Sequence, residues 1–217
     1  MGFQWEHVTI NKIILVLTAI VMVLALAGCG GEEKAGKKEA APAAKQTGTV
    51  TKKAEAAPAP ATENKKILVA YFSLTGNTRE VARMIQAKTG GELYEIKPEK
   101  PYPKEYGPAT DIAKKEKAEN ARPKLAGPLP DLKQYDIILL GYPIWWYMEP
   151  MAVKTFVEAQ DLSGKIILPF ATSGGSDIEG SVADLRKTLP NSQVKDGLLA
   201  NSTGFIDSWL KENGLLK

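Results

Sequence analysis

The sequence contains very little cysteine and histidine, the two residue types on which many protein sites depend. Cys29 is the only cysteine and His7 the only histidine among 217 residues. A disulfide-stabilised scaffold and a cysteine-rich metal site are therefore excluded. If the chain is processed before Cys29, His7 is removed too, and serine–histidine catalysis and imidazole metal sites lose their residues. Chemistry is then left to a bound cofactor or to carboxylate, lysine, tyrosine and hydroxyl groups.

An excess of charge of one sign is also lacking. The formal net charge is +3, and acidic and basic residues are interspersed along the chain. Because a nucleic-acid surface needs clustered lysine and arginine, we expect no nucleic-acid partner. The hydrophobic content of 44% and the charged content of 24% are those of an ordinary globular protein.

The N-terminus carries the features of an export signal. Residues 13–27 are apolar apart from Thr18, and Lys12 precedes them. This run is shorter than the roughly 20 residues of a membrane-spanning helix and fits the apolar region of a signal peptide. It ends in Leu26-Ala27-Gly28-Cys29, which resembles a bacterial lipobox. The resemblance implies that residues 1–28 are removed and that a lipid on Cys29 anchors the protein to the extracytoplasmic face of the cell membrane.

The alternative to a lipobox is a simple membrane anchor with an incidental cysteine. We favour the lipobox because the sole cysteine stands at the one position that such processing requires. Residues 29–64 are predicted to be a disordered linker, since this Ala-, Lys-, Glu- and Pro-rich stretch has too few large apolar side chains to offset the entropy of ordering. Its typical span as a flexible chain is on the order of 30–35 Å. Residues 65–217 have the size of one domain.

Strand-like and helix-like segments alternate along residues 65–217. Continuous apolar runs of strand length stand at 67–72 and 137–140, and further strands are expected at 93–96, 165–171 and, less clearly, 194–199. Apolar side chains recur between and after them at helical spacing: Val81, Ala82 and Ile85; Val153, Phe156 and Val157; Ile178, Val182, Leu185 and Leu189; and Phe205, Ile206, Trp209 and Leu210. Ser176 or Asp177 is expected to cap the third of these helices. This alternation predicts a doubly wound parallel α/β sheet, whose ligands bind at the carboxyl edge.

The segment 97–135 is long and irregular, with one charged, helix-compatible stretch around Asp111–Glu119. A solvated surface insertion is the simpler interpretation of its lysines and glutamates. A lid over a specific substrate, with Pro101–Tyr106 covering the site, is the alternative.

The loop after the first strand is a candidate phosphate site. It consists of Ser73, Leu74, Thr75, Gly76, Asn77 and Thr78 and directly precedes a helix. The N-terminus of that helix offers free backbone N–H groups and the positive end of the helix dipole. Gly76 permits close backbone approach, and the hydroxyl and amide side chains can donate hydrogen bonds to a monophosphate. An ordinary turn with a threonine cap is the alternative.

Two further loops follow the third and fourth strands. The first contains Pro143, Ile144, Trp145, Trp146 and Tyr147. We expect one of the two tryptophans to pack into the core, and we favour Trp145, followed by Trp146, for contact with a planar ring. The second contains Thr172, Ser173, Gly174 and Gly175, where small side chains let the backbone approach a ligand edge. A helix-capping turn is the alternative for this second loop.

Together, the segments YFSLTGNT, GYPIWW and PFATSGGS resemble the flavodoxin-like family of bacterial FMN proteins over nearly all of residues 65–217. Flavodoxins are themselves an example of the strand order 2-1-3-4-5 with FMN at the switch point between the first and third strands. The resemblance implies this five-stranded sheet, helices on both faces, and non-covalently bound FMN. One departure is that Tyr147 and Met148 stand where a small residue is expected after the paired tryptophans.

The resemblance implies a membrane-tethered FMN redox protein that exchanges electrons with a quinone or a redox partner protein. The alternative is a non-enzymatic module of the same fold that binds another phosphate-bearing ligand or a protein. Whether the protein is an enzyme or an electron carrier, and whether it forms a homodimer, stays open. No catalytic acid or base is assigned, and Tyr142, Tyr147 and Glu149 are the candidates.

Overall fold

The computed structural model describes residues 65–216 of the chain. The predicted signal peptide, the predicted lipidation site Cys29 and the predicted linker lie outside these residues. Within residues 65–216, no helix is long and apolar enough to cross a membrane.

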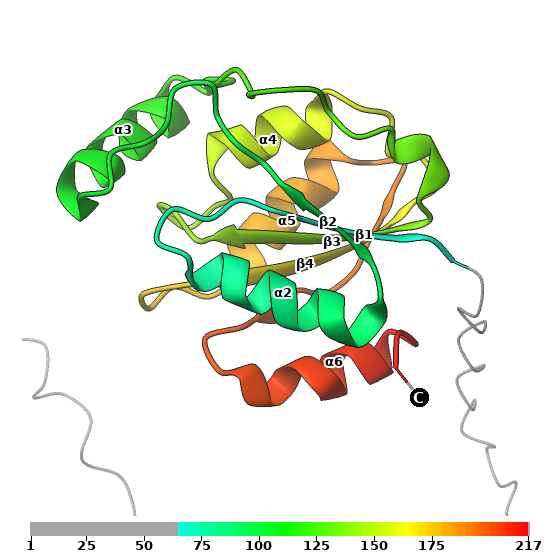
Figure 1. Ribbon diagram of the computed structural model, residues 1–217. Helices are drawn as coiled ribbons and strands as arrows, with labels where there is room; N and C mark the ends of the chain where they lie inside the picture. Colours follow the sequence, from blue (N-terminus) through cyan, green and yellow to red (C-terminus); the bar gives the residue numbers. More distant parts are fainter. Residues whose placement is uncertain (1–64, 217) are drawn as a thin grey trace, which may run out of the picture. The chain divides into compact units, whose positions relative to one another are not determined.

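A parallel sheet forms the centre of the fold (Figure 1). Its strands are β1 (Ile67–Tyr71), β2 (Glu92–Glu95), β3 (Ile137–Pro143), β4 (Ile166–Thr172), β5 (Gln193–Val194) and β6 (Leu198–Leu199). The strand order is β2-β1-β3-β4-β5, with β6 also pairing with β4, and every pairing within the sheet is parallel. The predicted order 2-1-3-4-5 is therefore confirmed.

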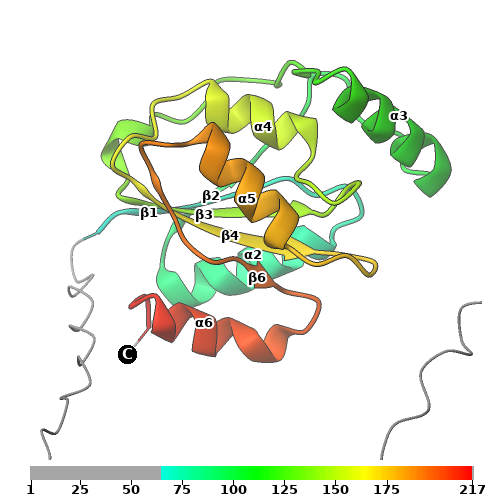
Figure 2. The ribbon, with the colours of Figure 1, turned by 180° about the vertical axis from the view of Figure 1, so that it is seen from behind.

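Helices cover both faces of this sheet (Figures 1 and 2). One face carries α2 (Asn77–Thr89) and α6 (Ile206–Glu212), and the other carries α4 (Met151–Glu158) and α5 (Glu179–Thr188). Alternate residues of β1 enter opposite cores: Leu68 and Ala70 pack on the α4 and α5 side, whereas Val69 and Tyr71 pack on the α2 and α6 side. Burial on both faces explains the unbroken apolar runs that identified the strands.

The fifth strand is interrupted, which corrects the single strand expected over 194–199. The backbone oxygen of Ile167 accepts a hydrogen bond from Lys195 N (2.9 Å), and that of Ala171 accepts one from Ala200 N (2.7 Å). These two residues of β4 therefore turn their backbone groups toward β5 and β6. Pro169 lies between them on the same side and has no N–H to donate. We attribute the break between β5 and β6 to this missing donor.

The segment 97–135 contains α3 (Tyr106–Ala118), which begins five residues before the predicted helical stretch. It packs through small side chains, because Ala109 and Ala113 are its buried residues. A short 3₁₀ helix, η1 (Leu132–Gln134), leads into β3, and η2 (Thr203–Phe205) leads into α6. The expected cap of α5 is wrong: the helix starts at Glu179 after Ile178, and no side chain bonds to its N-terminus.

Candidate functional site

The loop between β1 and α2 presents backbone donors to the carboxyl edge of the sheet. Gly76 caps α2 in a left-handed conformation (φ 104°), which glycine adopts without steric cost, and no side chain caps the helix. Gly76 N donates to Ser73 Oγ (3.1 Å), and Glu80 N donates to Gly76 O (3.0 Å). Among the described residues, none accepts a hydrogen bond from the N–H groups of Thr75, Asn77 or Thr78. Free amides at a helix N-terminus fit an anion.

The hydroxyls predicted to bind phosphate are not equally free. Thr75 and Asn77 are exposed, and Ser73 Oγ keeps its own O–H because it accepts the bond from Gly76. Thr78 is only 1% exposed, and its Oγ1 lies 2.9 Å from Thr172 Oγ1. Leu74 packs against the core instead of facing the loop's polar surface.

Arg79, in the first turn of α2, adds a cation that the sequence interpretation missed. Its guanidinium forms an ion pair with Glu95 at 2.5 Å. Burial raises the pKa of Glu95, but the hydrogen bonds and positive charges of Arg79 and Lys97 together hold that pKa below its usual range. In the sequence, Arg79 was visible as an arginine immediately after the loop. Its pairing with Glu95 of β2 could not be predicted, because the two residues are distant in the sequence.

The loop after β3 makes a tight two-residue hairpin. Trp145 N donates to Met148 O (2.8 Å), and Met148 N donates to Trp145 O (3.1 Å). The two central residues, Trp146 (φ 52°) and Tyr147 (φ 67°), are both left-handed. Such a turn normally contains asparagine and glycine, and each bulky residue in this conformation costs on the order of 1–3 kcal/mol. Strain of this kind clusters at ligand sites.

The two tryptophans have different environments. Trp145 is half-buried and packs edge-on against Phe72 and Tyr102, with ring centroids 5.3 Å and 5.0 Å away. Trp146 is 40% exposed and Tyr147 is 68% exposed. Trp145 is thus the tryptophan that packs against the core, and Ile144 packs beside it, whereas Pro143 ends β3.

Helix α3 holds the exposed tryptophan in place. Trp146 Nε1 donates to Thr110 O (3.0 Å), and Lys117 Nζ donates to Trp146 O (2.6 Å). Lys114 Nζ lies 5.2 Å from the centre of the Trp146 ring, within range of a cation–π contact. The segment 97–135 therefore directly contacts the loop of residues 143–149, which is called the ring loop below. The composition of the segment did not indicate this contact.

The loop after β4 is fixed by a residue that sequence reasoning missed. Asn201 Oδ1 accepts from Ser173 N (2.7 Å), and Asn201 Nδ2 donates to Ser173 O (2.8 Å). Ser173 Oγ accepts bonds from two backbone amides farther along the turn. Gly174 and Gly175 are exposed and face open space. Their backbone is thus accessible to a ligand edge.

Thr172 joins all three loops. Its hydroxyl contacts Thr78 in the first loop, and its backbone oxygen accepts a hydrogen bond from Ile144 N in the second (2.8 Å). The structure therefore brings together the predicted phosphate loop (residues 73–78), the ring loop and the small-residue loop (residues 172–175). This agrees with the expectation that the loops after parallel strands meet at the carboxyl edge of the sheet.

The candidate acid–base residues differ in accessibility. Tyr142 is fully buried and hydrogen-bonds to Ser181 (3.0 Å), and burial raises the pKa of its phenol far above the usual range. Tyr147 is exposed at the turn, whereas Glu149, two residues later, is buried. Gly141, which precedes them, is a packing residue, because a Cβ there would lie 2.2 Å from the Phe170 ring.

The fold and these loops define a doubly wound protein with a candidate anion-binding loop and an aromatic loop at one sheet edge. The model of the family described as Flavodoxin matches residues 66–213, and the chain belongs to this family. A flavodoxin of Haemophilus influenzae is 33% identical over 146 residues, covering 65% of this chain and 67% of its own. For Flavodoxin 1 of Escherichia coli, which is 28% identical, the chain spans 56% of the relative's length.

Solved structures give the same fold. A protein of Bacteroides eggerthii, assigned as a flavoprotein, is 39% identical with a TM-score of 0.62, and the match covers 69% of this chain and 98% of that chain. A flavoprotein of Lactobacillus acidophilus, solved in complex with FMN, is 24% identical with a TM-score of 0.57, covering 67% and 98%. The second likeness shows the fold alone.

Proposed function

We propose that the protein is an FMN-dependent electron-transfer protein, tethered outside the cytoplasm by a lipid on Cys29, which exchanges electrons with a membrane quinone or a redox partner protein. Membership of the flavodoxin family supports FMN as the cofactor and redox chemistry as its use. The observation that carries the proposal is the union of three loops through Thr172, which places free helix amides beside aromatic side chains.

The residues of the site fit FMN by their chemistry. The amides of Thr75, Asn77 and Thr78 would hold the phosphate, with the Thr75 hydroxyl as a further donor. No lysine of a nucleoside-triphosphate loop is present, which favours a monophosphate. Trp145 or Trp146 would contact the ring, and the backbone of Ser173 to Gly175 would bond to its polar edge.

Bound FMN supplies one- and two-electron redox chemistry, and the chain controls its position and access. Trp145 keeps the ring loop on the core through Phe72 and Tyr102. The rigid turn at Trp146 and Tyr147 fixes the backbone that would face the ring. Among the candidates for acid–base work, Tyr142 is enclosed with Ser181, so it serves packing instead of proton transfer.

The location determines which electron partners are available. The lipobox-like segment ending at Cys29 supports export, and the pyridine-nucleotide pool lies inside the cell. A membrane quinol or a redox protein is therefore the favoured donor. The domain lacks the strongly acidic surface used for docking to basic partners, which favours a small membrane-soluble acceptor over a basic protein.

Flavin spectroscopy on the purified chain tests the proposal. FMN added to the chain is expected to give a shifted absorbance band and quenched fluorescence, with one FMN bound per chain. Replacing Thr75 and Thr78 together by valine is expected to weaken binding sharply, whereas Thr188→Val, at the far end of α5, leaves it unchanged. A chain that takes up no FMN would instead favour the non-enzymatic binding module. Metabolic labelling with palmitate, compared with Cys29→Ala, tests the anchor separately.

A further inference from the structure

The residue that ends the ring loop, Glu149, is a buried carboxyl without a conventional partner. It is 2% exposed, and among the described residues no other residue donates an N–H or O–H group to either of its side-chain oxygens. Burying an unpaired carboxylate is very unfavourable, so the group must gain a proton or a counter-charge. Glu149 immediately follows Met148, whose backbone closes the hairpin with Trp145.

The neighbour of Glu149 is a second carboxyl, Asp184 of α5. Each carboxyl shifts the pKa of the other through a side-chain hydrogen bond, which requires their oxygens to lie within hydrogen-bonding reach. A carboxylate only accepts hydrogen bonds, so two carboxyls bond to each other only when one of them carries a proton. The apparent lack of a donor at Glu149 is explained if the donor is its own O–H.

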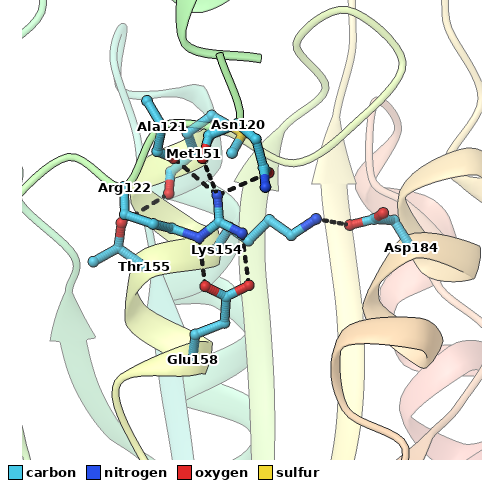
Figure 3. Close-up of polar contacts among 8 residues, drawn as sticks. All are labelled: Asn120, Ala121, Arg122, Met151, Lys154, Thr155, Glu158 and Asp184. Carbon is cyan, nitrogen blue, oxygen red and sulfur yellow. Dashed lines mark hydrogen bonds and ion pairs between the residues drawn. The ribbon is translucent and has the colours of Figure 1, made fainter. Parts of the chain in front are cut away.

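The surrounding charges agree with one shared proton. Lys154 Nζ of α4 lies 2.6 Å from Asp184 Oδ2, and the Arg122 guanidinium donates two hydrogen bonds to the Glu158 carboxylate (Figure 3). Lys154 is 9% exposed and is the cation bonded to the pair, whereas Arg122 is engaged by Glu158 nearer the surface. If Glu149 and Asp184 together hold one proton, Lys154 balances their single negative charge. A fully ionised pair would leave Glu149 as a buried negative charge with no bonded cation among the described residues. Tyr142 of β3 faces Glu149, and Lys187 of α5 faces Asp184.

Helix α5, which carries Asp184, packs against the ring loop. A Cβ on Gly180, in the first turn of α5, would lie 2.9 Å from Tyr147 O, so α5 backs directly onto the strained turn. Asp184 lies one turn farther along the same helix, and Lys154 lies one turn into α4, the helix that follows the ring loop. Charge on the pair therefore acts at short range on the ring loop.

We propose that Glu149 and Asp184 share one proton and form a proton-binding site that couples proton uptake to electron uptake at the ring loop. The role rests on the proposed function. An electron from the reduced quinone or redox partner makes the ring site more negative, which favours a proton on the pair. Where the pair is ionised, that proton comes from water and bonds to a carboxylate oxygen of Glu149; where the pair already holds its proton, electron uptake adds none. Conversely, ionisation of the pair at high pH makes electron uptake less favourable.

The directions in which the pKa values of Glu149 and Asp184 shift agree with this geometry. Burial and, next, the hydrogen bond with Asp184 raise the pKa of Glu149 to about 8. Burial also raises the pKa of Asp184, but the hydrogen bonds from Lys154 and Glu149, together with the positive charges of Lys154 and Lys187, hold it below the usual range. The proton thus resides on Glu149, and Asp184 is the charged partner.

Glu149→Gln isolates the titration from the packing, because its amide can donate to Asp184 as the protonated carboxyl does. In the FMN-free chain, carbon-13 NMR of the glutamate carboxyls is expected to show one group that titrates several pH units above the others and disappears in the variant. In the FMN-loaded chain, the midpoint potential is expected to fall more steeply above about pH 8 in the original protein than in Glu149→Gln, because below that pH Glu149 holds its proton before and after electron uptake. Glu179→Gln, which removes an exposed carboxylate from α5, keeps the original slope.

The outcomes separate this inference from the proposed function. If no glutamate titrates above the ordinary range, the shared proton is refuted whether or not FMN binds. If the titration is present but the two potential slopes agree, the coupling is refuted while the proposed function stands. If FMN does not bind at all, the proposed function and the coupling both fail. Should Glu149→Gln fold poorly, Asp184→Asn serves instead and is expected to lower the midpoint of the Glu149 titration.

Discussion

The hydroxyls of Thr78 and Thr172 lie 2.9 Å apart, although 94 residues separate them in the sequence. Thr78 is the second residue of the helix whose amides would bind a phosphate, and Thr172 ends the strand that leads into the small-residue loop. Since Thr172 also accepts a hydrogen bond from Ile144, one residue aligns all three loops of the candidate site. The alignment depends on parallel strands ending at a common edge.

Thr172→Val tests this alignment. Valine has the shape of threonine but removes the hydroxyl, while the backbone bond from Ile144 is retained. Loss of one hydrogen bond is worth about 1 kcal/mol, so we expect FMN to bind roughly 5- to 10-fold more weakly in a fluorescence titration. Thr172→Ser, which restores the hydroxyl, is expected to recover most of the affinity. Equal affinities for the valine and serine variants would contradict the role of the hydroxyl.

Gly141→Ala is expected to destabilise the fold through a clash with Phe170. The added Cβ would lie 2.2–2.9 Å from three atoms of that buried ring. Overpacking of this kind typically costs about 1–3 kcal/mol, measurable by urea denaturation. Gly174→Ala is the matched control because nothing lies within 4 Å of its Cβ position, and its effect should stay within about 0.5 kcal/mol. A similar loss in both variants would contradict the packing role.

Tyr147→Gly is expected to make the protein more stable than Tyr147→Ala. Both remove the 68% exposed ring, but only glycine adopts the left-handed conformation without a penalty of about 1–2 kcal/mol. The greater backbone freedom of unfolded glycine offsets part of this gain, which leaves a difference of about 1 kcal/mol. Thermal unfolding of the two variants provides the measurement, and an alanine variant as stable as the glycine variant would count against strain.

Glu149 is expected to make stability fall as pH rises. Its pKa in the fold is raised to about 8, so the folded state binds a proton more tightly than the unfolded chain does. This contribution is fully present below the ordinary glutamate pKa and is lost as pH rises through about 8. The slope for one proton is about 1.4 kcal/mol per pH unit. The lowered pKa of Asp184 acts in the opposite sense, at acidic pH.

Urea denaturation of the original chain and of Glu149→Gln between pH 5 and pH 9 measures this effect. The original chain should lose stability relative to the variant across the range and level off above pH 8. A constant difference between the two proteins would mean that Glu149 is not protonated in the fold.

Much of the architecture could be predicted because two-sided burial leaves a simple mark in the sequence. The central strands β1, β3 and β4 are continuous apolar runs, and their loops carry the glycines and aromatic residues of the site. Tyr147 was visible as a departure from the small residue expected after the paired tryptophans, and its positive φ value, like that of Trp146, gives that departure a physical meaning. Whether the predicted residues bind FMN stays a prediction.

The missed features all depend on partners distant in sequence. The start of α3 was obscured by Gly107 and Pro108, and its contact with Trp146 follows from tertiary packing. Asn201 carries no local motif, because its role arises from lying beside Ser173. The pairing of Glu149 with Asp184 likewise joins the loop before α4 to α5, and periodicity alone only indicated that Val182 and Leu185 share a face.

The interruption at Pro169 has a consequence for how the molecule meets its own copies. Beyond β4, the sheet ends in β5 and β6, which are two residues each. A neighbouring chain that tried to add a strand would find two short ladders out of line with each other, instead of a continuous row of donors and acceptors. The same proline that breaks the edge strand thus protects this border of the sheet against self-templated growth into fibres.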